Sequence, residues 1–287
     1  MVIKMDNSFV NNRNMNNNII KLLLIQNAAI IADKLKNFEN IDRLIENIND
    51  KNIDIIILPE LFSIGWACDK FNNLYELEDN SESLDYLRKL AKKFKANVIG
   101  GSIIIKDKNS DTLKNTQYIL NRNGDIITKY EKMHLYSYLG DSEGKYIQRG
   151  TNPVIATLDV CKVGLSICYD LRFPEIYRTY ALNGADLLIN TAAWPLSREN
   201  HWNSLAKARA IENQSFFVAL SQTGVLENGK LNIGQSLALD PLGDEITKLN
   251  RDEQAIITEI DLSQMFSLRD EVKTLKDINK EGYILKN

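Results

Sequence analysis

The sequence predicts one α/β domain that contains mixed β-sheets. Short apolar runs typical of buried strands alternate with segments whose apolar residues recur at helical spacing, and two strand pairs are joined by tight turns. No Pro/Ser-rich linker and no repeat of fixed period interrupts residues 19–264. We therefore expect a single domain over 19–264, an Asn-rich disordered leader over 1–18, and a charged carboxyl-terminal tail over 265–287 that lies over the surface or a partner subunit.

The amino-terminal half of the domain alternates strands and helices before a hairpin. The run "DIIILPE" (54–60) is too apolar to have one face in water, so layers must cover both sides of its sheet. Asn123-Gly124 supplies the positive φ values that a tight turn needs. The predicted elements are a strand at 21–26, a helix with apolar residues at 35, 38, 41, 44, 45 and 48, a strand at 54–60, a helix with its stripe at 84–94, a strand at 97–105 and a hairpin at 116–132.

The carboxyl-terminal half repeats this alternation. Pro174 is typical of the first turn of a helix, and the turn "DPLGDEI" (240–246) marks a second hairpin. The predicted elements are strands at 153–158 and 162–168, a helix from 174, a strand at 185–193, a helix at about 198–212, a strand at 215–222 and a last strand near 254–260.

Composition excludes several classes of function. The net charge of −3 provides no basic surface for nucleic acid or for anionic membrane, and no stretch approaches the roughly 20 apolar residues of a spanning helix. The amino terminus lacks the apolar region of a secretory signal. The three cysteines, Cys68, Cys161 and Cys168, form neither a disulfide framework nor a CxxC metal motif. We expect a cytoplasmic protein without nucleic-acid or membrane partners.

Three chemical groups stand where strands end. The strand "DIIILPE" ends in Glu60, the hairpin strand ends at Glu131-Lys132, and "KVGLSIC" ends in Cys168. Ligands of α/β sheets bind at the carboxyl ends of strands, where the chain leaves the sheet. A carboxylate, an ammonium and a thiol thus come from three separate strand ends.

These three groups suit nucleophilic attack on a carbonyl or nitrile carbon. A thiol needs an adjacent base, and a cation stabilises the thiolate. We expect the Cys168 sulfur to be held ionised between Glu60, the base, and Lys132, the cation. The backbone N–H of Tyr169 is the second donor for the negative charge that attack creates. Taken singly, Cys168 could be core filling and Glu60 and Lys132 could be solvated surface residues, whereas Cys68 and Cys161 are interpreted as structural.

The three motifs resemble the nitrilase superfamily of carbon–nitrogen hydrolases, whose hallmark is a Glu-Lys-Cys triad. "LPELF" is similar to the glutamate motif of the family, "YEKMHLY" to its lysine motif and "GLSICYDLRFPE" to its cysteine motif. They occur in the family's order and with its spacings. Further similar stretches are "ADLLINTAAWP", "HWNSLAKARAIENQSFFV" and "GQSLALDPLGD", so the resemblance covers roughly residues 20–262.

The resemblance implies a four-layer α-β-β-α sandwich, a homodimer or higher homo-oligomer paired through helices, and an activity without a cofactor. It implies that Glu60 is the general base, that Lys132 stabilises the tetrahedral intermediate, and that Cys168 forms a thioester when ammonia or an amine leaves. Many members carry a second glutamate that positions the lysine and the substrate. Glu143, in "GDSEGKYIQRG", is the candidate, and an exposed loop carboxylate is the alternative.

Other residues around these motifs have two interpretations each. Arg172 either forms a local ion pair with Glu175 at the helix start or binds a substrate carboxylate, as an arginine near this place does in relatives that act on amido acids. Trp194 is interpreted as a wall of the substrate pocket. The two histidines, His134 and His201, would be required by a Cys-His enzyme, but no signature of one is present, and structural hydrogen bonds are expected for both.

Within the superfamily, the compact segment between the lysine and cysteine motifs, "CYDLRFPE", "AAWP" and "ARAIENQ" are most similar to the ω-amidase branch. This implies an amide substrate that is a short ω-amido dicarboxylate, such as 2-oxoglutaramate, with Tyr169, Arg172 and Trp194 around it. The alternatives are hydrolysis of a carbamoyl amino acid, a deaminated glutathione or a nitrile, a non-catalytic binding protein on the same fold, and a subunit that supplies ammonia to a larger assembly.

Overall fold

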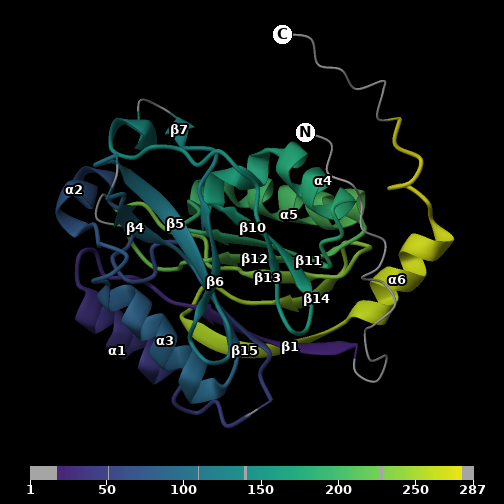
Figure 1. The fold of residues 1–287 in the computed structure, drawn as a ribbon, viewed down its shortest axis with the longest axis horizontal. Coiled ribbons are helices and arrows are strands. Elements are labelled where there is room, and N and C mark those ends of the chain that lie inside the picture. The colour runs from purple at the N-terminus through teal and green to yellow at the C-terminus, as the bar shows by residue number, and fades with distance from the viewer. Residues whose placement is uncertain (1–17, 51, 109, 139–140, 227–228, 280–287) are drawn as a thin grey trace.

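Two β-sheets lie face to face, and helices cover the outer face of each (Figure 1). The structure, a computed structural model, describes residues 18–50, 52–108, 110–138, 141–226 and 229–279. Residues 1–17 of the predicted leader and 280–287 of the predicted tail lie outside the described residues. The order of layers confirms the predicted α-β-β-α sandwich.

The first sheet has seven strands in the order β15-β1-β2-β3-β5-β4, and β6 pairs with β5 at its side. Strands β1, β2 and β3 run parallel, whereas the other pairings are antiparallel. The bounds are β1 (Ile19–Gln26), β2 (Ile55–Leu58), β3 (Asn97–Gly100), β4 (Ile103–Lys106), β5 (Leu113–Leu120), β6 (Ile126–Glu131) and β15 (Gln254–Asp261).

The second sheet has six strands in the order β14-β13-β12-β11-β10-β9. Its centre, β10, β11 and β12, is parallel, and a hairpin and β9 flank it in antiparallel pairing. The bounds are β9 (Ile155–Thr157), β10 (Lys162–Ile167), β11 (Leu187–Ala192), β12 (Phe216–Ser221), β13 (Leu237–Leu239) and β14 (Glu245–Lys248); β7 (Ser137–Tyr138) and β8 (Asp141–Ser142) form a separate short pair.

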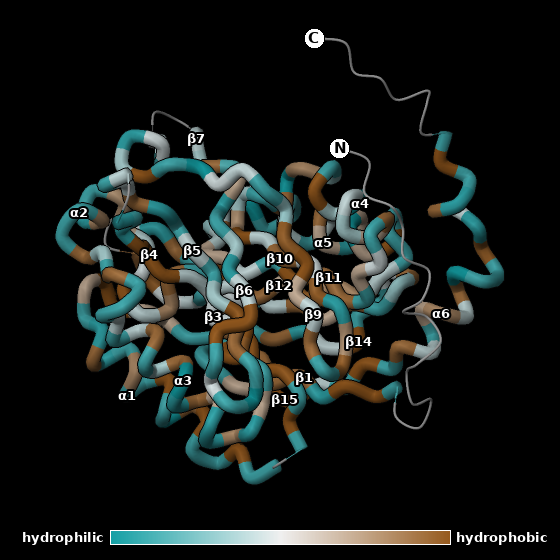
Figure 2. The backbone as a smooth tube through the Cα atoms, in the orientation of Figure 1, coloured by the Kyte–Doolittle hydropathy of each residue, from teal (hydrophilic) through white to brown (hydrophobic). Residues whose placement is uncertain are grey.

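The helices form the two outer layers. Their bounds are α1 (Lys34–Leu44), α2 (Phe71–Leu74), α3 (Glu82–Phe94), α4 (Pro174–Leu182), α5 (Glu199–Asn213) and α6 (Leu262–Glu271). Leu23 of β1 belongs to the same core cluster as Ile41 of α1 and Leu87 of α3. The neighbouring Leu22 belongs instead to the cluster that contains Leu165 of β10. Successive residues of one strand thus serve two cores, which explains the continuous apolar runs and the hydrophobic centre seen in Figure 2.

Two details of the predicted elements were wrong. The single strand expected over 97–105 is two strands, β3 and β4, because the chain turns at Gly101 with a φ of +54°. In the first hairpin only Gly124 has a positive φ, and the loop extends over 121–125. The predicted Asn123-Gly124 pair of positive φ values is therefore replaced by one left-handed glycine in a longer loop.

Part of the predicted tail is helical. Helix α6 spans the expected boundary at residue 264, and its Met265 is fully buried. Arg269 donates to the carbonyl oxygens of Gln214, at 2.9 Å, and of Ala185, at 3.2 Å. Burial lowers the pKa of this guanidinium, which is consistent with its close docking. Among the described residues, no helix combines the length and apolarity that crossing a membrane requires.

Candidate active site

The structure brings Glu60, Lys132, Glu143 and Cys168 together. Glu60 lies two residues after β2, Lys132 directly follows β6, and Cys168 directly follows β10. Glu143 begins a single helical turn, Glu143–Lys145, after the β7–β8 pair. All four side chains are buried, with exposed fractions from 0% to 7%. The site therefore lies where strands of both sheets end, as expected from the strand-end pattern.

Both carboxylate oxygens of Glu60 are held by hydrogen bonds. Oε1 accepts from Lys132 Nζ and from Asn115 Nδ2, each at 2.9 Å, and Oε2 accepts from the Ala193 N–H at 2.9 Å. The Glu60 carbonyl also accepts from Gln222 Nε2 at 2.6 Å. These donors fix the carboxylate in one orientation, so that a proton acceptor is preorganised beside the sulfur.

Lys132 lies between two carboxylates. Its Nζ is 2.9 Å from Glu60 Oε1 and 2.8 Å from Glu143 Oε2. Burial alone would lower the pKa of this ammonium, but the charges of Glu143 and Glu60 outweigh it and hold the pKa well above its usual value. Nζ also donates to Glu143 Oε1 at 2.9 Å, so each of its three N–H donors has a carboxylate oxygen within reach.

The backbone at Cys168 is strained. Its φ is +48°, a left-handed conformation that side chains other than glycine rarely adopt, and a short 3₁₀ turn, Cys168–Arg172, starts there. This conformation turns the chain sharply out of β10 and directs it into α4. Non-glycine residues held in such a conformation cluster at active sites, so the strain at Cys168 is consistent with a functional role.

The surroundings of the Cys168 sulfur favour the protonated thiol over the predicted thiolate. Burial and the charge of Glu60 raise the pKa of Cys168 well above its usual value, and Lys132 offsets them only in part. With both carboxylates ionised, Glu60, Glu143 and Lys132 together carry a net charge of −1. An ionised sulfur would bring the net charge of the cluster to −2, which is unfavourable in a buried site. The Glu60 carboxylate is near enough to raise the pKa of this thiol, and a carboxylate in that place can take the thiol proton during attack.

The excess negative charge also affects stability. Burial raises the pKa of Glu143, and the charge of Glu60 adds to this, against the opposing effect of Lys132. A raised folded pKa means that the unfolded chain releases this proton first as the pH rises. Stability associated with Glu143 is thus complete below about pH 4.5 and decreases as the pH rises through the folded pKa.

We therefore expect Glu143→Gln to increase the free energy of unfolding at neutral pH, because a buried carboxylate that is costly to ionise is removed, while activity decreases. Urea unfolding of both proteins at about pH 4 and pH 7 measures this difference. The gain should be present at neutral pH and vanish at acidic pH, where wild-type Glu143 is protonated in both states. A variant less stable than the wild type at neutral pH would contradict this charge balance.

Asp170 connects the lysine and cysteine motifs, and the sequence analysis did not single it out. Its carboxylate, fully buried, accepts from the Tyr130 hydroxyl at 2.7 Å, the Ile167 N–H at 2.9 Å and the His134 N–H at 3.0 Å. Tyr130 and His134 flank Lys132, and Ile167 precedes Cys168. One carboxylate thus sets the relative position of the two motifs, although only its place two residues after Cys168 could have indicated this.

Two glycines allow close backbone contacts behind the site. A Cβ atom on Gly101 would lie 2.0 Å from the Pro59 carbonyl oxygen, and one on Gly150 would lie 2.2 Å from the Glu131 carbonyl oxygen. Pro59 precedes Glu60, and Gly150 N–H donates to the Lys132 carbonyl at 2.8 Å. Larger side chains at these positions would displace the chain next to two of the site residues.

Arg172 lies between aromatic rings instead of pairing with Glu175. Its guanidinium is 4.9 Å from the centre of the Trp194 ring and 5.6 Å from that of the Tyr169 ring. Nη1 is 3.1 Å from His201 Nδ1. Both Arg172 and Glu175 are described, and no ion pair joins them. The predicted local pair is therefore absent, and the three predicted binding residues lie side by side.

The histidines have partners other than Cys168. His134 Nδ1 is 2.7 Å from Asp170 Oδ1, and its ring stacks on Phe173 with centroids 3.7 Å apart. His201 contacts Arg172. These contacts confirm the expected hydrogen-bonding roles. Within the described ranges, no group of three or more His, Cys, Asp and Glu side chains is arranged to hold a metal ion.

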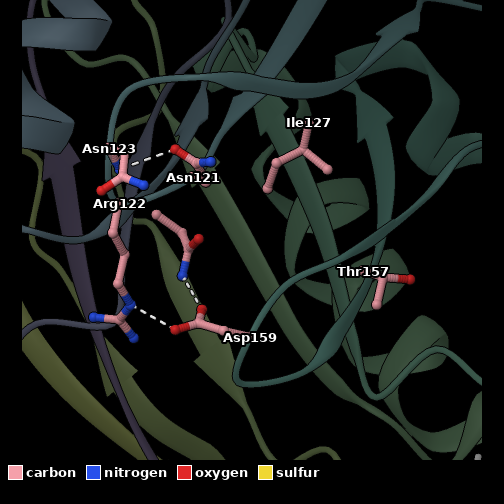
Figure 3. Close-up of a pocket in the computed structure, with 7 residues that line it drawn as sticks. Asn121, Arg122, Asn123, Ile127, Thr157 and Asp159 are labelled. Atoms are coloured by element: carbon pink, nitrogen blue, oxygen red, sulfur yellow. Dashed lines mark hydrogen bonds and ion pairs between the residues drawn. The ribbon is translucent and has the colours of Figure 1, made fainter.

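A surface hollow of about 350 Å³ lies away from these residues, near the amino-terminal ends of β3 and β10 (Figure 3). Its polar groups satisfy one another: Arg122 Nε donates to Asp159 at 2.6 Å, Arg122 Nη2 donates to Asp54 at 2.8 Å, and Asn97 Nδ2 donates to Asp159 at 2.6 Å. Asp54 and Asn97 belong to the first sheet, whereas Asp159 precedes β10 of the second. The residues around the hollow therefore form a hydrogen-bonded network that links the two sheets.

Comparisons with known proteins agree over most of the chain. The family model of carbon-nitrogen hydrolases matches residues 23–270. The chain is 37% identical over 233 residues to the 2-oxoglutaramate amidase of Bacillus subtilis (strain 168), covering 81% of this chain and 88% of that protein. It is 30% identical over 279 residues to Omega-amidase NIT3 of Saccharomyces cerevisiae, covering 92% and 94%. The crystal structure of Saccharomyces cerevisiae Nit3, a member of branch 10 of the nitrilase superfamily, matches with a TM-score of 0.82 and 29% identity over 92% of this chain and 97% of that one.

Proposed function

The chain belongs to the carbon–nitrogen hydrolase family, and on this premise we propose that it hydrolyses the terminal amide of a short ω-amido dicarboxylate, such as 2-oxoglutaramate, through a thioester on Cys168. The arrangement of Glu60, Lys132 and Cys168 carries the reaction type: a buried thiol within the field of a carboxylate that hydrogen bonds hold in place, beside a buried ammonium. The similarity to 2-oxoglutaramate amidase and ω-amidase supports the substrate class.

In the first half of the reaction, the Cys168 sulfur bonds to the amide carbon while the thiol proton moves to Glu60. The carbonyl oxygen takes up the electron pair and becomes an oxyanion. Lys132 redirects one N–H from the Glu143 carboxylate to this oxyanion, and the backbone N–H of Tyr169 also donates to it. Each donor is worth about 3 to 4 kcal/mol of barrier. The oxyanion then collapses, the C–N bond breaks, and Glu60 returns the proton to the departing nitrogen, which leaves as ammonia.

In the second half, a water molecule attacks the thioester carbon and Glu60 takes a proton from it. The second tetrahedral intermediate collapses, the C–S bond breaks, and the acid is released. The proton on Glu60 returns to the sulfur, which restores the thiol. Glu143 keeps Lys132 in place throughout, since its carboxylate accepts from Nζ and from the Tyr136 N–H at 2.6 Å.

Arg172 supports a substrate with a carboxylate at its far end. The guanidinium is partly buried against Trp194 and Tyr169, and no Asp or Glu of the described chain pairs with it. Its hydrogen bond to His201 is exposed to solvent and uses one N–H, so its remaining N–H donors can pair with an anion. It lies four residues after Cys168, so a carboxylate on a short substrate bound at the sulfur could supply that anion.

Replacing Arg172 by methionine is expected to raise KM for the ω-amido dicarboxylate by about 10- to 100-fold, because a charge-assisted contact is lost. KM for an uncharged amide of equal length should change little. Ammonia release with a panel of both substrates, a carbamoyl amino acid, a deaminated glutathione and a nitrile measures this. The matched control is Arg251→Met, which removes a surface arginine paired with Glu199. Equal effects of Arg172→Met on both amides would contradict the carboxylate assignment.

We also propose that the chain acts as a cytoplasmic homodimer paired through α4 and α5. Its three cysteines, all among the described residues, form no disulfide bond, which suits a reducing compartment. Ile211 of α5 is 52% exposed on this outer layer. Light scattering of the purified protein measures the number of subunits.

A further inference from the structure

We infer that His201 is a positioning residue that orients the Arg172 guanidinium and thereby sets the preference for amides that carry a carboxylate. This inference rests on the proposed function. His201 is the third residue of α5 and lies on the surface, 29 residues after Arg172 in the sequence. It would act through Arg172 and need not touch the reacting amide.

The contact between Arg172 and His201 requires a particular tautomer of the His201 ring. Arg172 Nη1 lies 3.1 Å from His201 Nδ1. A guanidinium has five N–H donors and no acceptor, so Nδ1 must contribute its lone pair. The ring is then neutral, with its proton on Nε2. A protonated ring would place two cations at this distance and would lose the acceptor.

The aromatic contacts alone leave the guanidinium free to turn. The rings of Trp194 and Tyr169 attract its charge at 4.9 Å and 5.6 Å, but a cation–π contact does not specify which N–H points where. The bond to His201 occupies one N–H of Nη1 and so fixes rotation in the guanidinium plane. In the described chain it is the one hydrogen bond that this guanidinium makes.

A fixed guanidinium matters for a carboxylate more than for other ligands. Bidentate pairing requires two N–H groups to point in parallel at the two carboxylate oxygens. If the side chain must be ordered during binding, part of the interaction energy is lost as side-chain entropy. His201 holds Arg172 in advance, so its removal should weaken the binding of anionic amides and leave uncharged amides unaffected.

Three variants test this inference with the full chain and two substrates, 2-oxoglutaramate and an uncharged primary amide of equal length. His201→Leu removes the acceptor and keeps side-chain bulk. His201→Gln supplies an amide oxygen that can accept from Nη1. Asn200→Leu adds the same apolar side chain at the neighbouring exposed position of α5. We expect His201→Leu to raise KM for 2-oxoglutaramate about fivefold, the scale of one hydrogen bond, with kcat unchanged. His201→Gln should restore most of this, and Asn200→Leu should have no effect.

The outcomes separate this inference from the proposed function. If Arg172→Met impairs 2-oxoglutaramate selectively but His201→Leu does not, the role of His201 is refuted and the substrate class stands. If His201→Leu lowers kcat for both amides, or if His201→Gln fails to restore KM, the residue is merely structural and the inference fails. If the wild type shows no preference for the carboxylate-bearing amide, the proposed substrate class is wrong, and the inference about His201 is wrong with it.

Discussion

Cys168→Ser is expected to lower kcat by about 10⁴-fold or more, the scale for loss of a covalent nucleophile. The serine hydroxyl fits the space of the thiol, but it is a far weaker nucleophile and its proton is harder to remove. Glu60 would accept a hydrogen bond from it and would not ionise it. Steady-state ammonia release at saturating amide, together with the melting temperature, measures this effect on a folded protein.

The matched control is Cys161→Ser. Cys161 is also buried, but it precedes β10, whereas Cys168 follows that strand at its other end. This substitution should leave kcat within the range of the wild type, because Cys161 lies away from the reacting atoms. If Cys161→Ser and Cys168→Ser lowered kcat equally, the sulfur of Cys168 would have no special part in the reaction.

Glu60→Gln is expected to lower kcat by about 10³-fold, within the range attributed to a general base and its positioning. Glutamine has nearly the same shape, but it cannot take the thiol proton. The NH₂ of its amide would also face a hydrogen-bond donor where the carboxylate oxygen was an acceptor. The donors around this side chain are Asn115 Nδ2, Lys132 Nζ and the Ala193 N–H. Both acylation and thioester hydrolysis should slow, which rapid-quench measurement of ammonia and acid can resolve separately.

Glu131→Gln is the control for this substitution. Glu131 immediately precedes Lys132, but its carboxylate pairs with Lys114 at 2.7 Å and lies partly exposed. Partly exposed ion pairs contribute little to folding stability. Loss of this pair should therefore leave the fold intact and have little effect on kcat. An equal loss of activity in both variants would mean that Glu60 acts through the fold and not as a base.

The layers of the fold were predictable because the hydrophobic pattern of each short segment indicates which of its faces are buried. The run at 54–60 is apolar at every position, and such a strand must have a layer on each face. The break at Gly101 was not predictable, since it depends on the approach of the Pro59 carbonyl, 42 residues earlier in the chain, to within 2.0 Å of the place a Cβ would occupy. Such contacts arise only when distant segments pack.

The site was predictable in part for the same reason. Glu60, Lys132 and Cys168 each end a strand, so the sheet topology alone brings them to one edge. The protonation of the sulfur was not predictable, because it depends on complete burial and on two carboxylates facing one ammonium. The role of Asp170 depends on partners up to 40 residues away in the sequence, which no local spacing reveals.

The most direct test is a mass spectrum of the protein mixed with 2-oxoglutaramate and quenched early, followed by digestion. The account predicts an added acyl mass on the peptide that contains Cys168, with ammonia already released and the adduct missing in Cys168→Ser. Turnover without any acyl adduct on that peptide, or an adduct on another residue, would contradict covalent catalysis by this thiol.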